Sequence, residues 1–241
     1  MTSEWEYHPA PDLEEGVVER LKRFPREPSM LMYGARSAAA LVLRAWLRTY
    51  HRLHIIGREN LPREGSFILV GNHTSHLDAL ALTASIPLKR LHRTFPAAAA
   101  DYFFSSLPRS VISAVFINAL PFERQAGGAQ SLTVCEKLLA RPGNILVIFP
   151  EGTRSTTGEL GRFRSGVGRL AAGNSIAVVP AFLHGAARAW PKGSALPRPR
   201  RLTLRIGEPR VYADLPPNRD SVGRICTELR EAVAELGRHK E

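Results

Sequence analysis

The chain has 241 residues, of which 44% are hydrophobic and 23% are charged, so it can bury a core and is not an intrinsically disordered polymer. Its 33 Lys and Arg residues outnumber the 22 Asp and Glu residues, and this surplus favours an anionic partner such as a phosphorylated substrate, an acidic lipid surface or a nucleic acid. The two cysteines, Cys135 and Cys226, have no metal-ligating neighbours, which argues against a disulfide framework or a cysteine-based zinc site.

The first part of the chain predicts a polar segment followed by a helix. Residues 1–28 are charged and contain no apolar segment of the kind that directs secretion. No window of the chain reaches about 18 uninterrupted apolar residues, so we expect no membrane-spanning helix. Between Ser29 and His51 the hydrophobic residues recur at helical spacing. The apolar positions are Leu31, Ala35, Ala38, Val42 and Trp46, whereas Arg36, Arg44 and Arg48 lie on another face.

This amphipathic helix has two compatible interpretations. A basic helix that carries a tryptophan is suited to lying on an anionic membrane, and its apolar stripe is equally suited to packing on the domain. We therefore predict residues 1–50 as an N-terminal helical extension and candidate membrane-interface element, and residues 51–241 as one domain. The expected location is the cytoplasmic face of a membrane, with peripheral or monotopic attachment, because the cysteine content fits a reducing compartment.

Strand-like and helix-like segments alternate along the rest of the chain. We expect strands at 54–57, 67–70, 93–98, 116–122, 144–149, 176–182 and 202–206, and helices at 75–85, 102–115, 129–140, 166–172 and 221–236. The run at 144–149 is continuously apolar, as in a strand buried on both faces, whereas 202–206 alternates as in a half-exposed strand. The alternation predicts an α/β fold with a largely parallel central sheet flanked by helices.

The polar stretch Gly71–Asp78 lies between two apolar runs, as in a strand-to-helix junction where α/β folds place their chemistry. The spacing of His73 and Asp78 suits a general base held by an orienting carboxylate. Asp78 also has a purely structural interpretation, because Ser75 and Asp78 fit a capping box at the start of a helix. A metal site at His73 and His76 is disfavoured, since two histidines three apart need a helix that begins only after them.

A second polar loop, Phe149–Ser155, follows a buried apolar strand. The carboxyl ends of parallel strands share one edge of a sheet, so this loop and the stretch 71–78 are expected to face a common crevice. Gly152 permits close backbone approach, and Arg154 offers a planar donor fork that matches a phosphate. Another arginine, Arg124, ends a third strand-like element. Together these residues are typical of a site that activates a hydroxyl group on a phosphorylated molecule.

Four segments now stand in order along the chain: Asn-His-x-Ser-x-x-Asp at 72–78, Phe-Glu-Arg at 122–124, Phe-Pro-Glu-Gly-Thr-Arg-Ser at 149–155 and Val-Val-Pro-Ala at 178–181. They resemble the four blocks of the glycerolipid acyltransferases, the lysophosphatidic acid acyltransferase-like family, over about residues 50 to 215. The first and third blocks together are highly specific. The second departs from the family pattern, because Leu120 and Pro121 precede Phe122. Since proline cannot donate to a sheet ladder, we expect an edge strand or one that ends early.

The resemblance implies transfer of a fatty acyl group from acyl-CoA or acyl carrier protein to a lysophospholipid hydroxyl, with 1-acylglycerol-3-phosphate as the leading acceptor and phosphatidic acid as the product. In this scheme His73 is the general base, and Asp78 fixes its tautomer and stabilises the imidazolium. The implied phosphate-binding residues are Arg124, Glu151, Gly152, Thr153 and Arg154, the two arginines as ligands and residues 151–153 as the loop that shapes the site. No metal and no cofactor are expected, because the thiolate of the acyl thioester is a good leaving group.

The expected partners are the lysophospholipid and acyl thioester substrates, an anionic membrane surface and, for one of the two donors, acyl carrier protein. Nucleic acid is not expected, because the aromatic residues cluster at 102–104 beside apolar residues. Within the same chemistry, the alternative acceptor is another lysophospholipid or an acylated amino acid. The alternative of a different class is a non-catalytic module that binds anionic lipid. A serine esterase is disfavoured, because the sequence has no Gly-x-Ser-x-Gly elbow.

Overall fold

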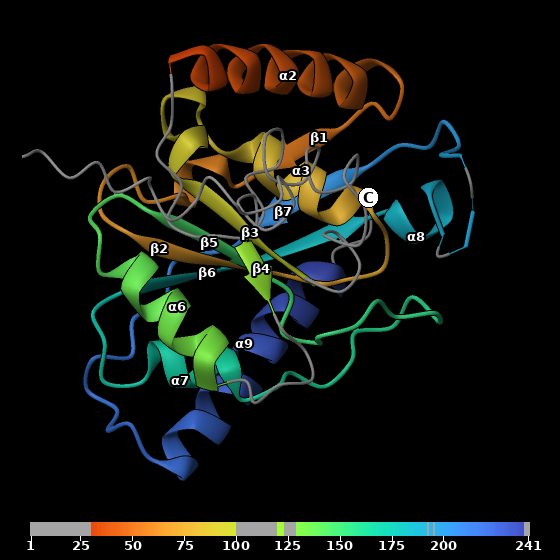
Figure 1. The fold of residues 1–241 in the computed structure, drawn as a ribbon. Helices are drawn as coiled ribbons and strands as arrows, with labels where there is room; N and C mark the ends of the chain where they lie inside the picture. Colours follow the sequence, from red (N-terminus) through yellow and green to blue (C-terminus); the bar gives the residue numbers. More distant parts are fainter. Residues whose placement is uncertain (1–29, 100–119, 123–128, 192, 195, 239–241) are drawn as a thin grey trace, which may run out of the picture.

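The computed structural model describes residues 30–99, 120–122, 129–191, 193–194 and 196–238. These residues form a central sheet with helices on both of its faces (Figure 1). The helices are α2 (Met30–Thr49), α3 (Leu77–Ser85), α6 (Ala129–Leu139), α7 (Gly166–Ala171), α8 (Ala186–Ala189) and α9 (Arg219–Arg238), with short 3-10 helices η1 (Arg58–Asn60) and η2 (Leu88–Arg93). The strands are β1 (His54–Ile56), β2 (Phe67–Gly71), β3 (Thr94–Ala99), β4 (Leu120–Phe122), β5 (Ile145–Ile148), β6 (Ala177–His184) and β7 (Thr203–Ile206).

The described residues form a sheet of seven strands in the order β1-β7-β6-β2-β5-β3-β4. Strands β2 to β6 all run in one direction, whereas β7 is antiparallel to β6 and β1 is parallel to β7. The predicted α/β fold with a largely parallel sheet is therefore confirmed, with an opposed pair of strands at one side. The edge strand expected at Pro121 is also confirmed, because β4 is the last strand of the sheet and needs no donors on its outer side.

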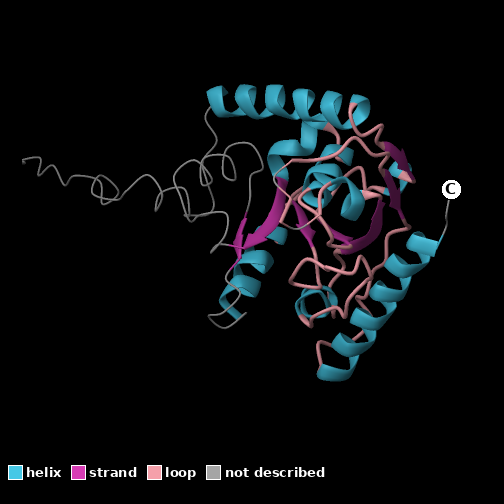
Figure 2. Ribbon diagram, turned by 90° about the vertical axis from the view of Figure 1, so that its right-hand side faces the viewer, coloured by secondary structure: helices cyan, strands magenta, loops and turns pink. Residues whose placement is uncertain are grey.

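The central strands are buried on both faces, which explains their continuous apolar sequences. In β2, Phe67 and Leu69 join a hydrophobic core with residues of α2 and α3. The alternate residues Ile68 and Val70 join a second core with residues of α6, α7 and α9. Figure 2, turned by 90°, shows the same arrangement of a sheet between two layers of helices.

The predicted elements that fall on described residues are confirmed, with boundaries that differ by no more than two residues. The helix expected at 102–115 and the part of the 116–122 strand before Leu120 lie outside the described residues. The half-exposed character expected for the last strand is wrong, because Thr203 is only 3% exposed. Strand β7 lies inside the sheet, between β1 and β6, and not at its edge.

Helix α2 presents most of its predicted apolar stripe to solvent, which fits the membrane-interface interpretation, although Trp46 packs against the core. Val42 is 70% exposed, and the adjacent Leu41 is 54% exposed. Of the arginines on the other face, Arg36 is buried, and burial lowers its pKa, whereas Arg48 is exposed. Leu47 lies in the core that α2 shares with α3. None of the helices formed by the described residues is both long and apolar enough to cross a bilayer.

Hydrogen bonds to the end of α3 explain why basic side chains point inward. The Arg44 guanidinium donates to Ile86 O, the residue that caps the carboxyl end of α3. Arg58 Nε donates to the carbonyl of the adjacent Ser85 over 2.9 Å. The last carbonyls of a helix lack intrahelical partners and favour cations. The periodicity of α2 predicts the helix, but these partner carbonyls are distant in sequence and cannot be inferred from it.

The parallel strands bring the two predicted loops to one edge of the sheet. Strands β2 and β5 are hydrogen-bonded neighbours, with Val70 opposite Ile148. Strand β6 lies on the other side of β2, with Gly71 opposite Ala181. The segments that follow β2 and β5 therefore leave the sheet side by side, as the sequence predicted.

The junction of β1 with β7 gives a stability prediction. Gly57 has a φ of +78°, and a Cβ there would lie 2.1 Å from Ile206 O in β7. Gly65 has a similar φ of +71°, but a Cβ there would meet nothing within 4 Å. We expect Gly65→Ala to cost about 1 kcal/mol through its left-handed backbone alone, and Gly57→Ala to cost about 3 kcal/mol or more because the strands must also separate. Urea unfolding of both variants measures this difference, and equal losses would contradict the close packing at Gly57.

Candidate active site

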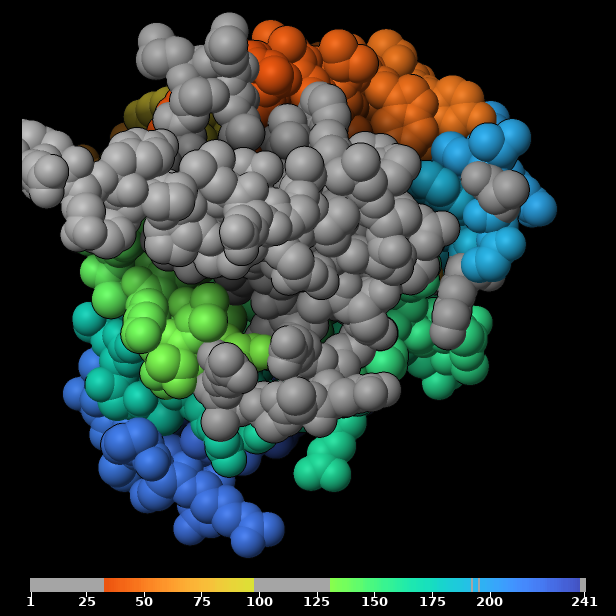
Figure 3. All heavy atoms as spheres, viewed as in Figure 1, coloured from red at the N-terminus to blue at the C-terminus, as the bar shows by residue number. Residues whose placement is uncertain are grey.

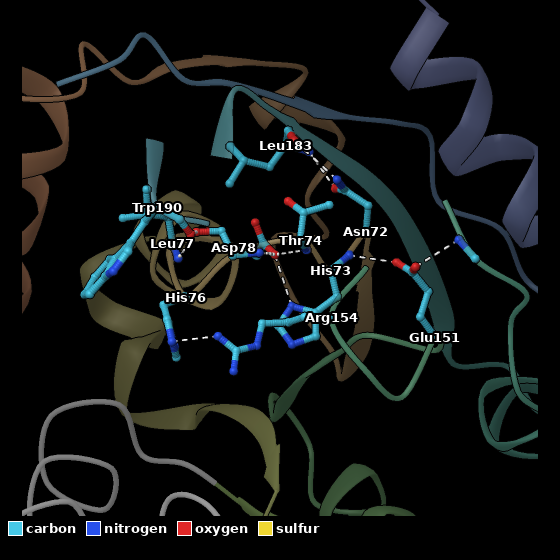
Figure 4. A network of polar contacts seen from close by, with 12 residues as sticks. Asn72, His73, Thr74, His76, Leu77, Asp78, Glu151, Arg154, Leu183 and Trp190 are labelled. Carbon is cyan, nitrogen blue, oxygen red and sulfur yellow. Dashed lines mark hydrogen bonds and ion pairs between the residues drawn. The ribbon is translucent and has the colours of Figure 1, made fainter. Parts of the chain in front are cut away.

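His73 and Asp78 form a hydrogen-bonded pair at the junction of β2 and α3. His73 Nδ1 lies 3.0 Å from Asp78 Oδ2, and the same oxygen accepts from the backbone N–H groups of Thr74 at 2.6 Å and Ser75 at 2.7 Å (Figure 4). Ser75 Oγ accepts from the N–H of Leu77. The base-and-carboxylate pairing predicted from the sequence is therefore present. Of the capping box, the bond from the Ser75 N–H to Asp78 is present, whereas the Asp78 N–H donates to Ser75 O and not to Oγ, and His76 is the residue that precedes α3.

The surroundings of His73 leave one ring nitrogen for chemistry. Asp78 is fully buried, whereas the His73 side chain is 18% exposed. The imidazole stacks on the ring of Phe149, the last residue before Pro150, with ring centroids 4.3 Å apart and planes 16° apart. Because an anionic carboxylate only accepts, Nδ1 carries the hydrogen and Nε2 is the basic nitrogen. The histidine thus has a fixed tautomer and a fixed ring plane, as a general base requires.

Glu151, expected to help shape the phosphate-binding loop, holds two backbone amides with its carboxylate. Glu151 Oε1 accepts from the His73 N–H at 2.7 Å, and Oε2 accepts from the Gly161 N–H at 2.9 Å. Burial raises the pKa of Glu151, and these two hydrogen bonds oppose that shift. An anionic side chain committed to two amides would repel a phosphate, so we assign it to positioning His73 and the loop that follows β5. The reciprocal contact, from Ser155 N–H to His73 O at 2.8 Å, ties the same segments together.

The other residues of the β5 loop differ in their surroundings. Gly152 has a φ of +74°, and the Arg164 side chain packs so closely over it that a Cβ would lie 2.6 Å from Arg164 Nε. Thr153 is exposed, and Arg154 is half-buried. Arg124, the remaining predicted phosphate ligand, lies outside the described residues. Gly152 therefore permits close approach, as expected, but the approaching group in this structure is an arginine of the chain.

His76, which the sequence did not connect with the chemistry, contacts Arg154. Arg154 Nη1 lies 2.6 Å from His76 Nε2 (Figure 4). Arginine can only donate, so this nitrogen must be the unprotonated acceptor of a neutral imidazole. Burial lowers the pKa of His76, as do the charges of Arg154 and His73, while Asp78 acts in the opposite direction. The arginine predicted to bind phosphate is thus oriented by a residue on the β2 side of the site.

Two further contacts connect the β2 junction to the strand and helix beyond it. The Asn72 side chain exchanges two hydrogen bonds with the backbone of Leu183 in β6, at 2.8 and 3.3 Å. Ser75 Oγ donates to Trp190 O at 2.7 Å. Strand β6 and the end of α8 therefore both help to fix the loop that carries His73.

The sequence did not predict the contacts of three residues of this site, namely Phe149, His76 and Arg164. Phe149 lies in the motif at 149–155, and Arg164 follows that motif closely. No spacing rule relates His76 to Arg154, which are 78 positions apart. Among the described residues, no three of His, Cys, Asp and Glu come together as metal ligands.

Comparison with known proteins identifies related chains. A family model described as Acyltransferase matches residues 52–184. A chloroplastic 1-acyl-sn-glycerol-3-phosphate acyltransferase of Arabidopsis thaliana is 30% identical over 194 residues, which cover 77% of this chain and 49% of that protein. A protein of the same name from Chlamydomonas reinhardtii is 32% identical over 77% of this chain and 53% of its own length. This chain thus spans about half the length of these two relatives.

Two bacterial proteins match over more of their length. A 1-acyl-sn-glycerol-3-phosphate acyltransferase of Bacillus subtilis is 28% identical over 81% of this chain and 90% of that protein. The crystal structure of the 1-acyl-sn-glycerophosphate acyltransferase of Thermotoga maritima has a TM-score of 0.67 and 21% identity, and the match covers 93% of this chain and 88% of that one. This structural likeness establishes the fold.

The contact between His76 and Arg154 predicts a pH dependence of stability. Because the pKa of His76 is lowered from 6.5, the unfolded chain binds this proton more readily. The contribution of neutral His76 is therefore complete above the unfolded value and declines as the pH falls below it. His76→Gln keeps an acceptor for Arg154 and removes the titration.

We expect wild type to lose more unfolding free energy than His76→Gln between about pH 7.5 and about pH 5.5. Denaturant unfolding at both pH values measures the difference, and the comparison removes the contributions of the other histidines. Parallel losses in the two proteins would show that His76 is not held neutral in the fold.

Proposed function

The chain belongs to the acyltransferase family, and we propose that it transfers a fatty acyl group from an acyl thioester to the hydroxyl of a lysophospholipid. The proposed acceptor is 1-acyl-sn-glycerol-3-phosphate and the product phosphatidic acid. The observation that carries the proposal is the hydrogen bond between His73 Nδ1 and the buried Asp78 carboxylate. The names of the relatives, which specify this acceptor, support its choice.

The proposed reaction uses His73 as a general base. Nε2 accepts the proton of the acceptor hydroxyl while the hydroxyl oxygen attacks the thioester carbonyl carbon. The carbon–sulfur bond then breaks, the ester forms, and the thiolate leaves and recovers a proton from the imidazolium. Asp78 stabilises the imidazolium without taking its proton. The donor, acyl-CoA or acyl carrier protein, is a co-substrate, and these steps need neither a cofactor nor a metal.

Arginine side chains are proposed to bind the acceptor's phosphate. Arg154 presents a planar fork beside the base and is oriented by His76. Arg164, packed over Gly152, supplies a second positive charge at the same loop. Arg124 stays a proposed ligand on the strength of the sequence resemblance. Another lysophospholipid or an acylated amino acid is the alternative acceptor.

The outer face of α2 is the surface proposed to contact an anionic membrane, at its cytoplasmic face. Leu41 and Val42 are exposed there. After the end of the helix, Tyr50 OH donates to Pro197 O. This hydrogen bond brings Leu196, which is 76% exposed, to the same end of α2. Figure 3 shows α2, in orange, on the outside of the molecule. Exposed apolar side chains on a helix with arginine nearby suit monotopic insertion into the interface. Attachment is thus proposed through apolar residues, and not through Arg36 and Arg44, which face the domain.

The catalytic assignment predicts the effect of replacing His73. We expect His73→Ala to lower acyl transfer from acyl-CoA to 1-acylglycerol-3-phosphate by about 10²–10⁴-fold, because the general base is lost. The measurement is release of free CoA by purified protein in detergent. His54→Ala, at an exposed histidine of β1, is the matched control and should keep wild-type activity.

Full activity of His73→Ala would contradict the assignment. If wild type releases no CoA with any lysolipid yet binds anionic vesicles, the non-catalytic lipid-binding alternative is the correct one.

The phosphate assignment predicts a change in acceptor selectivity. We expect Arg154→Ala to lower kcat/KM for a phosphorylated acceptor by about 10- to 100-fold, as for loss of a charged hydrogen bond, and to affect a neutral monoacylglycerol much less. Arg224→Ala, at an exposed arginine paired with Glu228 on α9, should change neither rate. Equal losses with both acceptors would give Arg154 a role other than binding phosphate.

The proposed membrane contact of α2 predicts weaker vesicle binding when its exposed apolar side chains are replaced. The double variant Leu41→Ser/Val42→Ser should bind vesicles with anionic lipid about tenfold more weakly, since two apolar side chains no longer enter the interface. Val211→Ser is the control, because Val211 is 54% exposed, like Leu41, but precedes α9 on the other side of the sheet. Vesicle co-sedimentation gives the binding constants. Unchanged binding of the double variant would remove this face of α2 from the membrane contact.

A further inference from the structure

A cleft with a volume of about 920 Å³ lies between helix α9 and the segment that runs from the β5 loop into α7. It is not part of the site around His73. Its lining residues are Arg162, Phe163, Ser165, Arg169, Pro217, Asn218, Arg219, Val222, Gly223, Cys226, Thr227 and Arg230. Its volume falls in the range of about 300–1,000 Å³ that small-molecule sites occupy.

The charge of the cleft is of one sign. Four of its lining residues are arginines and none is acidic. All four arginines are exposed, and within the described part of the chain no carboxylate forms an ion pair with them. By contrast, Arg224 on the same helix is neutralised by Glu228, with Nε 2.7 Å from Oε1. A concave surface that concentrates unneutralised arginines favours a ligand with several negative charges.

The cleft also has an apolar floor. Phe163 is 4% exposed and Cys226 is 7% exposed, and both belong to the core beneath α9. Val222 packs against the same core. A ligand that fits both parts combines phosphate groups with a flat apolar ring, as nucleotides do.

A chain of hydrogen bonds connects the cleft with the base. Arg230 donates from Nε to Gly161 O at 3.0 Å and from Nη2 to Leu160 O at 3.2 Å. The N–H of Gly161 donates to Glu151, whose other oxygen accepts from the backbone of His73. One end of the cleft therefore adjoins Gly161, in the loop that Glu151 connects to the backbone of His73.

We propose that the cleft binds the phosphate groups and adenine ring of coenzyme A when acyl-CoA is the donor. This proposal rests on the acyl-transfer function proposed above. In acyl-CoA the pantetheine arm separates the nucleotide from the thioester, so the phosphates must bind away from His73. Arginine forks match phosphate oxygens, and the apolar floor accepts the adenine. The recessed shape favours this ligand over the surface of a carrier protein, which needs a broad contact area.

The test measures binding of CoA to the full-length protein in detergent by calorimetry. In the double variant Arg169→Glu/Arg219→Glu the dissociation constant for CoA should rise about tenfold or more. The control Arg224→Glu should leave it unchanged. In wild type, 3′-dephospho-CoA should bind more weakly than CoA, and both should weaken with added salt. Arg219→Gln provides a milder change at one of the same positions, with a smaller rise expected.

Steady-state kinetics supply a second readout. The double variant should raise the KM for acyl-CoA by a similar factor and leave the KM for the lysophospholipid unchanged. A CoA affinity that is the same in the double variant and in wild type would overturn the cleft assignment while leaving acyl transfer intact. The assignment is equally overturned if the substitutions weaken use of acyl carrier protein and spare CoA. If the cleft variants lose CoA binding but wild type transfers no acyl group, the cleft site stands and the proposed function fails.

Discussion

The charge of Asp78 is the feature on which the geometry of the site depends. One fully buried oxygen accepts from the His73 ring and from two successive backbone amides. A buried carboxylate is tolerated only where donors surround it, and here the donors are the turn that begins α3. The carboxylate that orients the His73 ring thus also holds the turn that begins α3, so a change in one of these interactions changes the other. This explains why a capping interpretation and a catalytic interpretation of one motif are compatible.

A second buried carboxylate, Glu151, does the equivalent work between strands. It joins the His73 backbone to Gly161, far along the loop that follows β5. Parallel pairing of β2 with β5 brings these loops together, but the pairing alone does not fix the position of one loop relative to the other. Both oxygens accept from backbone amides. The position of His73 therefore depends on the backbone of the two loops and not on the side chains of His73 and Gly161. In the proposed reaction, both acidic residues of the site therefore position groups, and the arginines carry the recognition of phosphate.

The sequence predicted the elements more reliably than their orientation. Runs such as Ile145–Ile148 specify a doubly buried strand by composition alone, and the junction at His73 is encoded within one short segment. The failures concern contacts between distant residues. The hydrogen bond from Arg44 to Ile86 O joins residues far apart in the sequence, and so does the one from the His73 N–H to Glu151. Likewise, the partnership of His76 with Arg154 requires the register of two strands, which local patterns do not provide.

The two proposed surfaces lie at different ends of the molecule, with the sheet between them. In Figure 3 the α2 surface is at the top, and the blue segment that includes the beginning of α9 is at the bottom. This separation suits a reaction with one lipid and one water-soluble substrate, because a membrane contact through α2 leaves the α9 side open to solvent. His73 follows the carboxyl end of β2, between the core shared with α2 and the core shared with α9. A nucleotide held beside Arg230 would then adjoin the Gly161 loop, whose amide reaches the base through a single carboxylate.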